Sequence, residues 1–168
     1  MNLSKKMLLL IALVCSGLLA AALYLQLVEN MLPCPLCVFQ RYAFALIAVF
    51  CLVAAFTKGI AHKLMNGLAL LSALVGLGVA GKHVWLLEHP ALSCGIDPLE
   101  TGLNSIFLAQ WWPTMFKADG LCETPYPPTL GLSLPAWAGI FFILFTLTLL
   151  VLLVRKQKSQ RSMFASTR

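Results

Sequence analysis

The chain has 168 residues, of which 60% are hydrophobic and only 11% are charged. Soluble domains carry about 25% charged residues, so this composition excludes an ordinary soluble protein and indicates a membrane protein. The net charge of +6 does not indicate nucleic-acid binding, because neither a basic face nor aromatic base-reading residues accompany the lysines.

Four apolar segments are long enough to cross a bilayer as helices. A spanning helix needs about 20 apolar residues, because lipid offers no hydrogen-bond partners and a helix pairs its own backbone groups. The segments cover residues 7–28, 37–57, 64–87 and 133–154. The first is too long for a signal peptide, so we expect it to remain as a helix. The sequence predicts an all-α membrane protein in which residues 1–168 form one domain, a four-transmembrane-helix bundle.

The charged residues predict the orientation of these segments. Basic residues precede the first segment, lie between the second and third, and form the tail at 155–168, whereas all six acidic residues fall in the other two connections. The positive-inside rule then places both termini in the cytoplasm. The short connection at about 29–36 and the long connection at about 88–132 face outward, which is the periplasmic side of a bacterial inner membrane.

The six cysteines divide by location. Two lie inside apolar segments, where cysteine usually behaves as a small hydrophobic residue: Cys15 and Cys51. The other four lie in or beside the outward-facing connections: Cys34, Cys37, Cys94 and Cys122. Disulfides form and persist on that oxidising side of the membrane, so these four are the candidates for redox chemistry.

Residues 34–37 read Cys-Pro-Leu-Cys, a spacing that lets the two sulfurs meet across one turn and cycle between dithiol and disulfide. Cys37 falls at the start of the second apolar segment, where the helix dipole stabilises a thiolate. Arg41 follows one turn later on the same face and adds positive potential. A zinc site of the paired type would need a second cysteine pair, which the sequence lacks. We therefore predict a redox-active pair and no metal.

The two cysteines of the long connection, Cys94 and Cys122, could form either a structural or an exchanging disulfide. A bridge between them would close a loop of about 29 residues and stabilise the fold by roughly 3–4 kcal/mol. An exposed bridge in such a loop is also open to attack by a soluble thiol. Between them, residues 103–115 have helical spacing and two adjacent tryptophans, which predicts a short helix lying in the membrane interface.

Two disulfide-forming pairs on one face of a membrane suggest a path for electrons. Electrons would enter at the exposed loop pair, pass by thiol–disulfide exchange to the Cys34–Cys37 pair, and leave to a lipid-soluble acceptor. The membrane contains quinones, which bring their own redox chemistry, so the protein need supply only position and charge. Arg41 would then stabilise the negative charge that develops on the quinone.

This combination resembles the bacterial disulfide bond formation protein B (DsbB) family. The resemblance covers nearly the whole chain and includes the Leu-Pro-Ala-Trp stretch at residues 134–137. It implies an enzyme, a thiol:quinone oxidoreductase that sustains disulfide bond formation. Such an enzyme reoxidises a periplasmic DsbA-type thioredoxin-fold protein and passes the electrons to ubiquinone or menaquinone, with no metal.

The resemblance also implies roles for single residues. Cys94 would form the mixed disulfide with the DsbA-type partner, and Cys122 would be its partner in the loop. Cys34 would exchange with Cys122. Cys37 would contact the quinone, with Arg41 beside it.

A histidine near the outer end of the third segment is linked with the quinone site in the family. Both His83 and His89 are candidates, and His89 fits the expected spacing better. Lys82 stands where the family often has an arginine, and lysine lacks the planar, bidentate donor geometry of that residue.

Three alternative functions remain open. A vitamin K epoxide reductase-like enzyme also pairs loop cysteines with a Cys-x-x-Cys at the membrane edge, although there the Cys-x-x-Cys is expected after the loop pair in sequence. A non-enzymatic four-helix scaffold with two structural disulfides would carry the same cysteines. A relative of the family that serves one dedicated partner would also share these features.

Overall fold

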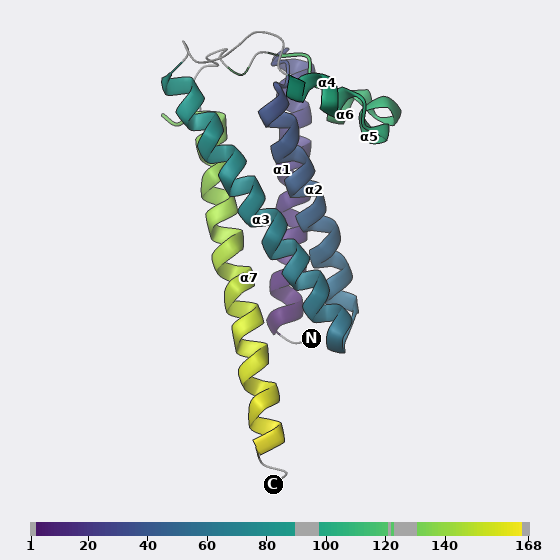
Figure 1. The fold of residues 1–168 in the computed structure, drawn as a ribbon, viewed down its shortest axis with the longest axis vertical. Helices are drawn as coiled ribbons and strands as arrows, with labels where there is room; N and C mark the ends of the chain where they lie inside the picture. Colours follow the sequence, from purple (N-terminus) through teal and green to yellow (C-terminus); the bar gives the residue numbers. More distant parts are fainter. Residues whose placement is uncertain (1–2, 90–97, 121, 123–130, 166–168) are drawn as a thin grey trace.

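The computed structural model describes residues 3–89, 98–120, 122 and 131–165, with only the backbone described for residues 98, 99 and 155–165. Its body consists of four long helices (Figure 1): α1 (Leu3–Val28), α2 (Pro35–Phe56), α3 (Gly59–Glu88) and α7 (Leu134–Ala165). Each contains a stretch long and apolar enough to span a bilayer. The predicted all-α, four-transmembrane-helix architecture is therefore confirmed.

Both ends of the chain lie at the same end of the bundle, and three short helices lie at the opposite end, called here the loop end (Figure 1). These are α4 (Pro98–Asn104), α5 (Phe107–Trp111) and α6 (Pro113–Phe116). They project to one side, next to α1 and α2. The described parts of the two connections, which contain Cys34 and Cys122, therefore meet at the loop end.

The start of α2 is determined by the Cys-Pro-Leu-Cys motif itself. Cys34 is the N-cap, and its sulfur accepts a hydrogen bond from the backbone N–H of Cys37 at 3.3 Å. Pro35 occupies the first turn, where the missing N–H costs nothing and the fixed φ suits a helix. This local geometry puts both cysteines of the motif at the positive end of the helix dipole.

The core depends on close packing of α3 against α7. The ring of Phe142 in α7 stacks on Phe44 of α2, with centroids 4.2 Å apart, and is fully buried. On the other side of this ring lies Gly76 of α3, where an added Cβ would overlap the ring. Small residues allow such close approach between helices in a membrane, where apolar burial alone does not drive helices together.

The segment between the loop cysteines forms three short helices instead of the one helix predicted over residues 103–115. Pro113 cannot continue a helix, and Trp112 before it leaves the helical region with φ −132° and ψ 70°. Ile106 makes a second break with an extended backbone. The expected helical segment is thus present but is divided at two points.

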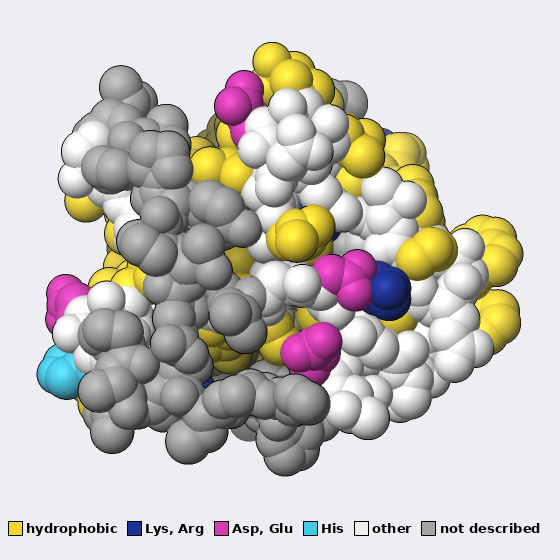
Figure 2. Space-filling view, turned by 90° about the horizontal axis from the view of Figure 1, so that it is seen from above, with side chains coloured by type: hydrophobic (Ala, Val, Ile, Leu, Met, Phe, Trp, Pro, Cys, Tyr) yellow, Lys and Arg dark blue, Asp and Glu magenta, His cyan; other side chains and the backbone are white. Residues whose placement is uncertain are grey.

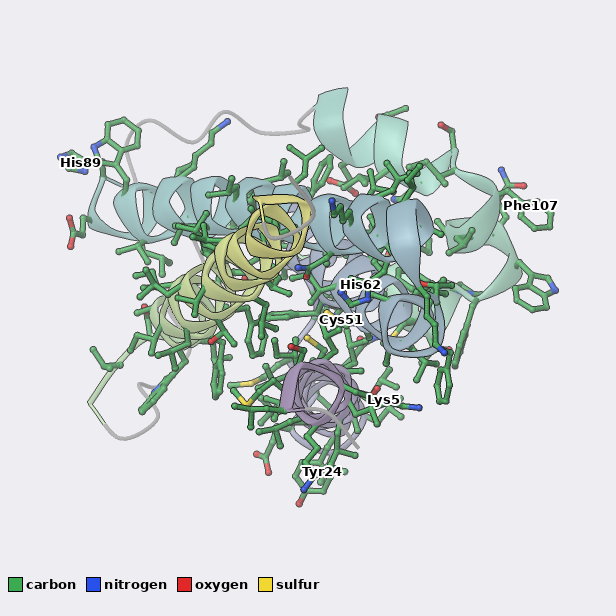
Figure 3. The ribbon with its side chains drawn as sticks, turned by 90° about the horizontal axis from the view of Figure 1, so that it is seen from below. Lys5, Tyr24, Cys51, His62, His89 and Phe107 are labelled. Carbon is green, nitrogen blue, oxygen red and sulfur yellow. The ribbon has the colours of Figure 1, made fainter. Side chains whose placement is uncertain are left out.

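The segment α5–α6 has one buried and one exposed side. Ala109, Met115 and Phe116 are buried against α1 and α2, and the Phe116 ring stacks on Tyr42 at 4.5 Å. Phe107 and Trp111 are 70% and 75% exposed, and Figure 3 shows Phe107 at the outer edge, pointing away from the bundle. Figure 2, viewed onto the loop end, shows hydrophobic side chains along this same edge. Exposed tryptophan and phenylalanine beside a spanning bundle match an interfacial position.

Candidate functional site

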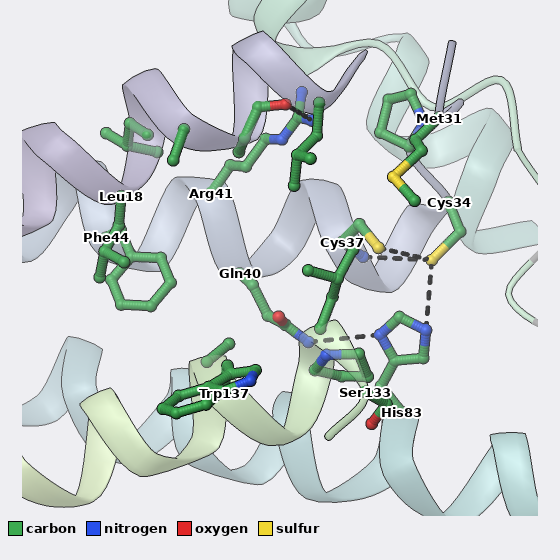
Figure 4. A pocket seen from close by; sticks show the side chains of 18 of the residues that line it. Leu18, Met31, Cys34, Cys37, Gln40, Arg41, Phe44, His83, Ser133 and Trp137 are labelled. Atoms are coloured by element: carbon green, nitrogen blue, oxygen red, sulfur yellow. Dashed lines mark hydrogen bonds between the residues drawn. The ribbon is translucent and has the colours of Figure 1, made fainter. Parts of the chain in front are cut away.

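A compact cluster of donor atoms lies at the loop end of the bundle (Figure 4). The sulfurs of Cys34 and Cys37 are 3.2 Å apart, and the Cys34 sulfur is 3.7 Å from Nε2 of His83. Cys34 and His83 are buried, whereas Cys37 is half-buried. Both cysteines are free thiols. The Cys-x-x-Cys motif and the third transmembrane helix therefore meet in one site.

The cluster continues from His83 to Gln40. Gln40 was not among the site residues predicted from the sequence. The Nε2 atom of Gln40 is 3.4 Å from Nδ1 of His83, and both side chains are buried. Gln40 thus fixes the ring whose other nitrogen faces Cys34. The sequence does contain a signal for Gln40, because a polar side chain inside an apolar membrane segment usually has a function.

The two histidines near the end of α3 lie in different environments. His83 is in the cysteine cluster, whereas His89 is exposed. The Nδ1 atom of His89 lies 3.0 Å from the Trp85 carbonyl oxygen, and its ring stacks on the Trp85 indole. Figure 3 shows His89 at the edge of the molecule. The structure therefore brings His83, and not His89, to the cysteines; Lys82 is exposed.

Cys122 from the long connection joins the same cluster. Its side chain hydrogen-bonds with Cys34, and the backbone of Leu36 also interacts with it. The hydrogen bonds with Cys122 and Cys37, together with burial, raise the pKa of Cys34. The hydrogen bond from Cys34 lowers the pKa of Cys122 to about 7. Near pH 7, about half of Cys122 is therefore a thiolate, whereas Cys34 stays protonated.

Two backbone contacts dock the loop beside Cys34. The N–H groups of Asp119 and Gly120 both donate to the Pro33 carbonyl oxygen at 3.1 Å. At Gly120, an added Cβ would lie 2.5 Å from the carbonyl oxygen of Leu32, so only glycine allows this approach. Because Gly120 is two residues from Cys122, this contact places the loop cysteine at the start of α2.

A side-chain clamp holds the preceding residues of the loop. Asn104 donates to the Ala118 carbonyl oxygen at 2.9 Å and accepts from the Ala118 N–H at 2.8 Å. Ala118 is fully buried and packs with Val38 of α2 and Leu103 of α4. The loop is therefore fastened both to itself and to the helix that carries the Cys-x-x-Cys motif.

Arg41 is 7% exposed and links three parts of the chain. Its Nη1 donates to Oε1 of Gln26 in α1 at 2.6 Å and to the carbonyl oxygen of Met115 in α6 at 3.1 Å. Its Nη2 donates to the Ala22 carbonyl oxygen at 3.3 Å. Figure 4 shows the side chain reaching toward α1. The sequence placed Arg41 one turn from Cys37, but it did not indicate these partners.

A cavity of about 350 Å³ adjoins the cluster. Its apolar walls come from α1, α2, α3 and α7, including Leu18, Phe44 and Trp137. Its polar lining is concentrated at the cysteines, with these members: Cys34, Cys37, Gln40, Arg41, His83, Cys122 and Ser133. An apolar cavity with a few convergent polar groups is typical of a binding site for a small organic molecule.

The remaining cysteines do not join this cluster in the described part of the chain. Cys15 and Cys51 are fully buried in the apolar core, and Figure 3 shows Cys51 inside the bundle. Cys94 lies outside the described residues, so its pairing with Cys122 stays a prediction.

Comparisons with known proteins identify the family of this chain. Residues 4–152 match the sequence model of the family described as "Disulfide bond formation protein DsbB". A protein named disulfide bond formation protein B from Herminiimonas arsenicoxydans is 54% identical over 154 residues, covering 92% of this chain and 98% of that protein. Proteins of the same name from Ralstonia nicotianae and Cupriavidus necator are 48% and 50% identical, over 92% and 94% of this chain and 97% and 98% of their own lengths. The chain belongs to the DsbB family of disulfide bond formation proteins.

Proposed function

We propose that this membrane oxidoreductase of disulfide bond formation reoxidises a periplasmic DsbA-type thioredoxin-fold protein and passes the electrons to ubiquinone or menaquinone. The observation that carries the proposal is the contact of Cys122 with Cys34 beside an apolar cavity. Through that contact, the loop that would meet a soluble partner is connected to the Cys34–Cys37 pair, which lines the cavity between the membrane helices. The charge pattern supports a bacterial inner-membrane location with the loop end facing the periplasm.

The first half of the reaction takes electrons from the partner into the loop. A thiolate of the partner attacks the sulfur of Cys94 in a Cys94–Cys122 disulfide, and Cys122 leaves as a thiolate. With Cys34 held in a disulfide, the backbone of Leu36 and the charge of His83 still lower the pKa of Cys122, which favours its departure because leaving thiols of low pKa depart faster. The Cys122 thiolate is then beside Cys34.

The second half passes the electrons to the Cys34–Cys37 pair. The Cys122 thiolate attacks Cys34 in a Cys34–Cys37 disulfide, and Cys37 leaves as a thiolate at the start of α2, where the helix dipole stabilises it. The partner's second thiolate releases the oxidised partner from Cys94. Cys94 then attacks Cys122, which restores the loop disulfide and leaves Cys34 and Cys37 as a dithiol.

The residues around the cavity fit a quinone. A bound quinone would accept the two electrons and two protons of the dithiol. Its head group needs an apolar enclosure with hydrogen-bond donors for two carbonyl oxygens, and the cavity offers Leu18, Phe44 and Trp137 as walls and Gln40 and His83 as polar groups. Each of these polar groups is buried, so water competes little for their hydrogen bonds.

We assign the histidine role at this site to His83 in place of His89. His83 lines the cavity and faces Cys34. Arg41 also lines the cavity, and its cationic side chain favours negative charge on Cys37 and on the acceptor. Its bonds to Gln26 and to the Met115 carbonyl oxygen give it a second role, which is to hold α6 against the membrane helices.

The purified full chain tests the proposal directly. In detergent, a reduced DsbA-type protein is added with a soluble ubiquinone analogue, and quinone reduction is followed by absorbance. We expect partner-dependent reduction that is lost in Cys37→Ser and retained in Cys15→Ala. A chain that neither becomes reduced by the partner nor reduces the quinone would be a scaffold, and the proposal would fail.

A further inference from the structure

The sequence contains one Cys-x-x-Cys pair, Cys34 and Cys37, and the fold places His83 beside it. The ligand atoms of Cys34, Cys37 and His83 all lie within 4.8 Å of one another. Two thiol sulfurs and one imidazole nitrogen are a donor set that thiophilic divalent cations prefer. We propose that Cys34, Cys37 and His83 form a binding site for a divalent cation of the Zn²⁺ class in the reduced protein.

The distances between the donors suit tetrahedral coordination. Zn–S bonds of about 2.3 Å put two sulfurs about 3.8 Å apart around a tetrahedral ion. The two sulfurs are 3.2 Å apart, and the Cys34 sulfur is 3.7 Å from Nε2 of His83. Moving the Cys37 sulfur about half an ångström further from the Cys34 sulfur would bring this pair to tetrahedral spacing, and the Cys37 sulfur already lies within 4.8 Å of the ligand nitrogen of His83. The three donors form one face of the tetrahedron, and the fourth position is left for water.

The surroundings of the donors resemble the outer shell of metal sites. Metal-bound histidines almost always donate their second ring N–H to a neighbouring acceptor. The side-chain amide of Gln40 lies 3.4 Å from Nδ1 of His83; with its carbonyl oxygen turned to the ring, it accepts that N–H and leaves Nε2 free for the ion. The backbone N–H of Cys37 already donates to the Cys34 sulfur, as it would to a thiolate ligand.

Binding depends on the redox state of the cysteines. A Cys34–Cys37 disulfide has no thiolate to offer, so the oxidised pair does not hold the ion. In the reduced protein, two protons leave the thiols as the ion binds, and two thiolates neutralise its charge inside the bundle. If the proposed electron path is correct, the ion also blocks it, because neither sulfur is then free to exchange.

Cobalt titration of the reduced full chain in detergent tests the site without using oxidase activity. Co²⁺ is a spectroscopic substitute for Zn²⁺, and its visible bands report tetrahedral geometry while its ultraviolet bands report thiolate bonds. We expect one Co²⁺ per reduced chain, displaced by Zn²⁺, and none in the oxidised chain. The double variant Cys94→Ser with Cys122→Ser should keep this binding, since the loop cysteines are not ligands.

Substitutions at the two histidines near the C-terminal end of α3, His83 and His89, decide the ligand set. His83→Gln should weaken Co²⁺ binding by about tenfold or more, because it removes a ligand, whereas His89→Gln, at an exposed position of the same helix end, should leave binding unchanged. His83→Cys should restore binding with stronger thiolate bands, which separates a lost ligand from a misfolded variant. Equal affinities for His83→Gln and His89→Gln, or loss of binding with the loop cysteines, would overturn the proposal.

Discussion

The thiol of Cys34, at the start of α2, hydrogen-bonds to Cys122 from the long connection between α3 and α7. This contact lowers the pKa of Cys122 to about 7 and raises that of Cys34. The two cysteines through which electrons would pass between the loop and the membrane are therefore already neighbours, and Cys122 lies beside the sulfur that it would attack in a Cys34–Cys37 disulfide.

The pH dependence of Cys122 alkylation measures this contact. Because the pKa of Cys122 is about 7, the reactive thiolate predominates above pH 7 and is lost as the pH falls below it. In the reduced chain, iodoacetamide labelling of Cys122, followed by peptide mass spectrometry, should reach half its maximal rate near pH 7. Cys34→Ala removes the hydrogen bond, so the midpoint should rise toward that of a free thiol, about 8.5. A midpoint that does not move would contradict the assigned cause.

Gly120 controls how closely the loop approaches α2. In Gly120→Ala, the new Cβ meets the Leu32 carbonyl oxygen, a backbone atom that cannot rotate away. Such overpacking costs about 1–3 kcal/mol, or roughly 5- to 150-fold in the docked population. With Cys37→Ser and Cys94→Ser as background, formation of the Cys34–Cys122 disulfide by an added oxidant should slow accordingly. Gly102→Ala, in open space on α4, is the control and should form the bridge at the parent rate.

Arg41 has a charge and a set of hydrogen bonds, and two substitutions separate them. Arg41→Lys keeps the charge but cannot bond Gln26, Ala22 and Met115 together, whereas Arg41→Met loses both. We expect Arg41→Met to raise the apparent KM for quinone by about tenfold, since hydrogen bonds to charged groups contribute about 1.5–3 kcal/mol. Affinity for the DsbA-type partner should change little. If Arg41→Lys matches the parent in quinone kinetics, charge alone accounts for the residue.

The two histidines near the end of α3 provide a matched pair for the quinone reaction. His83→Gln removes the ring that faces Cys34 at the edge of the cavity, so we expect kcat for quinone reduction to fall by about 100-fold or more, within the range typical of lost acid–base groups. His89→Gln alters an exposed side chain and should leave kcat unchanged. Steady-state assays with a reduced partner protein measure kcat for both variants. A larger loss of kcat in His89→Gln than in His83→Gln would assign the role to His89.

Two glycines of α3 test the packing of the bundle. Gly76→Ala drives a methyl group into the buried Phe142 ring, whereas Gly78→Ala adds one in open space. Overpacking of this kind costs about 1–3 kcal/mol, so Gly76→Ala should lower the midpoint of thermal unfolding in detergent. Gly78→Ala should leave the midpoint nearly unchanged. Equal midpoints for the two variants would show that α7 shifts freely away from α3.

The division of the loop segment into α4, α5 and α6 shows that apolar spacing alone does not predict where a helix is interrupted. The apolar spacing over residues 103–115 predicted one helix, and the buried side of α5–α6 does follow that spacing. Pro113 was a visible breaker, but the turn at Ile106 carries no comparable sequence signal and lies where α5 begins its packing on α1 and α2. Contacts with distant helices outweighed local helix preference there.

The sequence pattern likewise did not show which of His83 and His89 lies beside the cysteines. Six residues turn a helix by about 240° in excess of one full turn, so the two side chains leave α3 in different directions. Which of them faces the cysteines depends on how α3 is rotated, and that rotation is set where Gly76 admits the Phe142 ring. No local pattern around either histidine contains this information.

Hydropathy, helix length and the spacing of Cys34 and Cys37 are properties of continuous stretches, so the amino-acid sequence was enough to predict the four spanning helices, the Cys-x-x-Cys motif at the start of the second and the family. The folded chain was needed to show that Cys122 meets Cys34, that His83 and Gln40 join them, and that Arg41 ties α1 to α6. These contacts join residues far apart in the chain, and they exist only because close helix packing and the docking of Gly120 bring their backbones together.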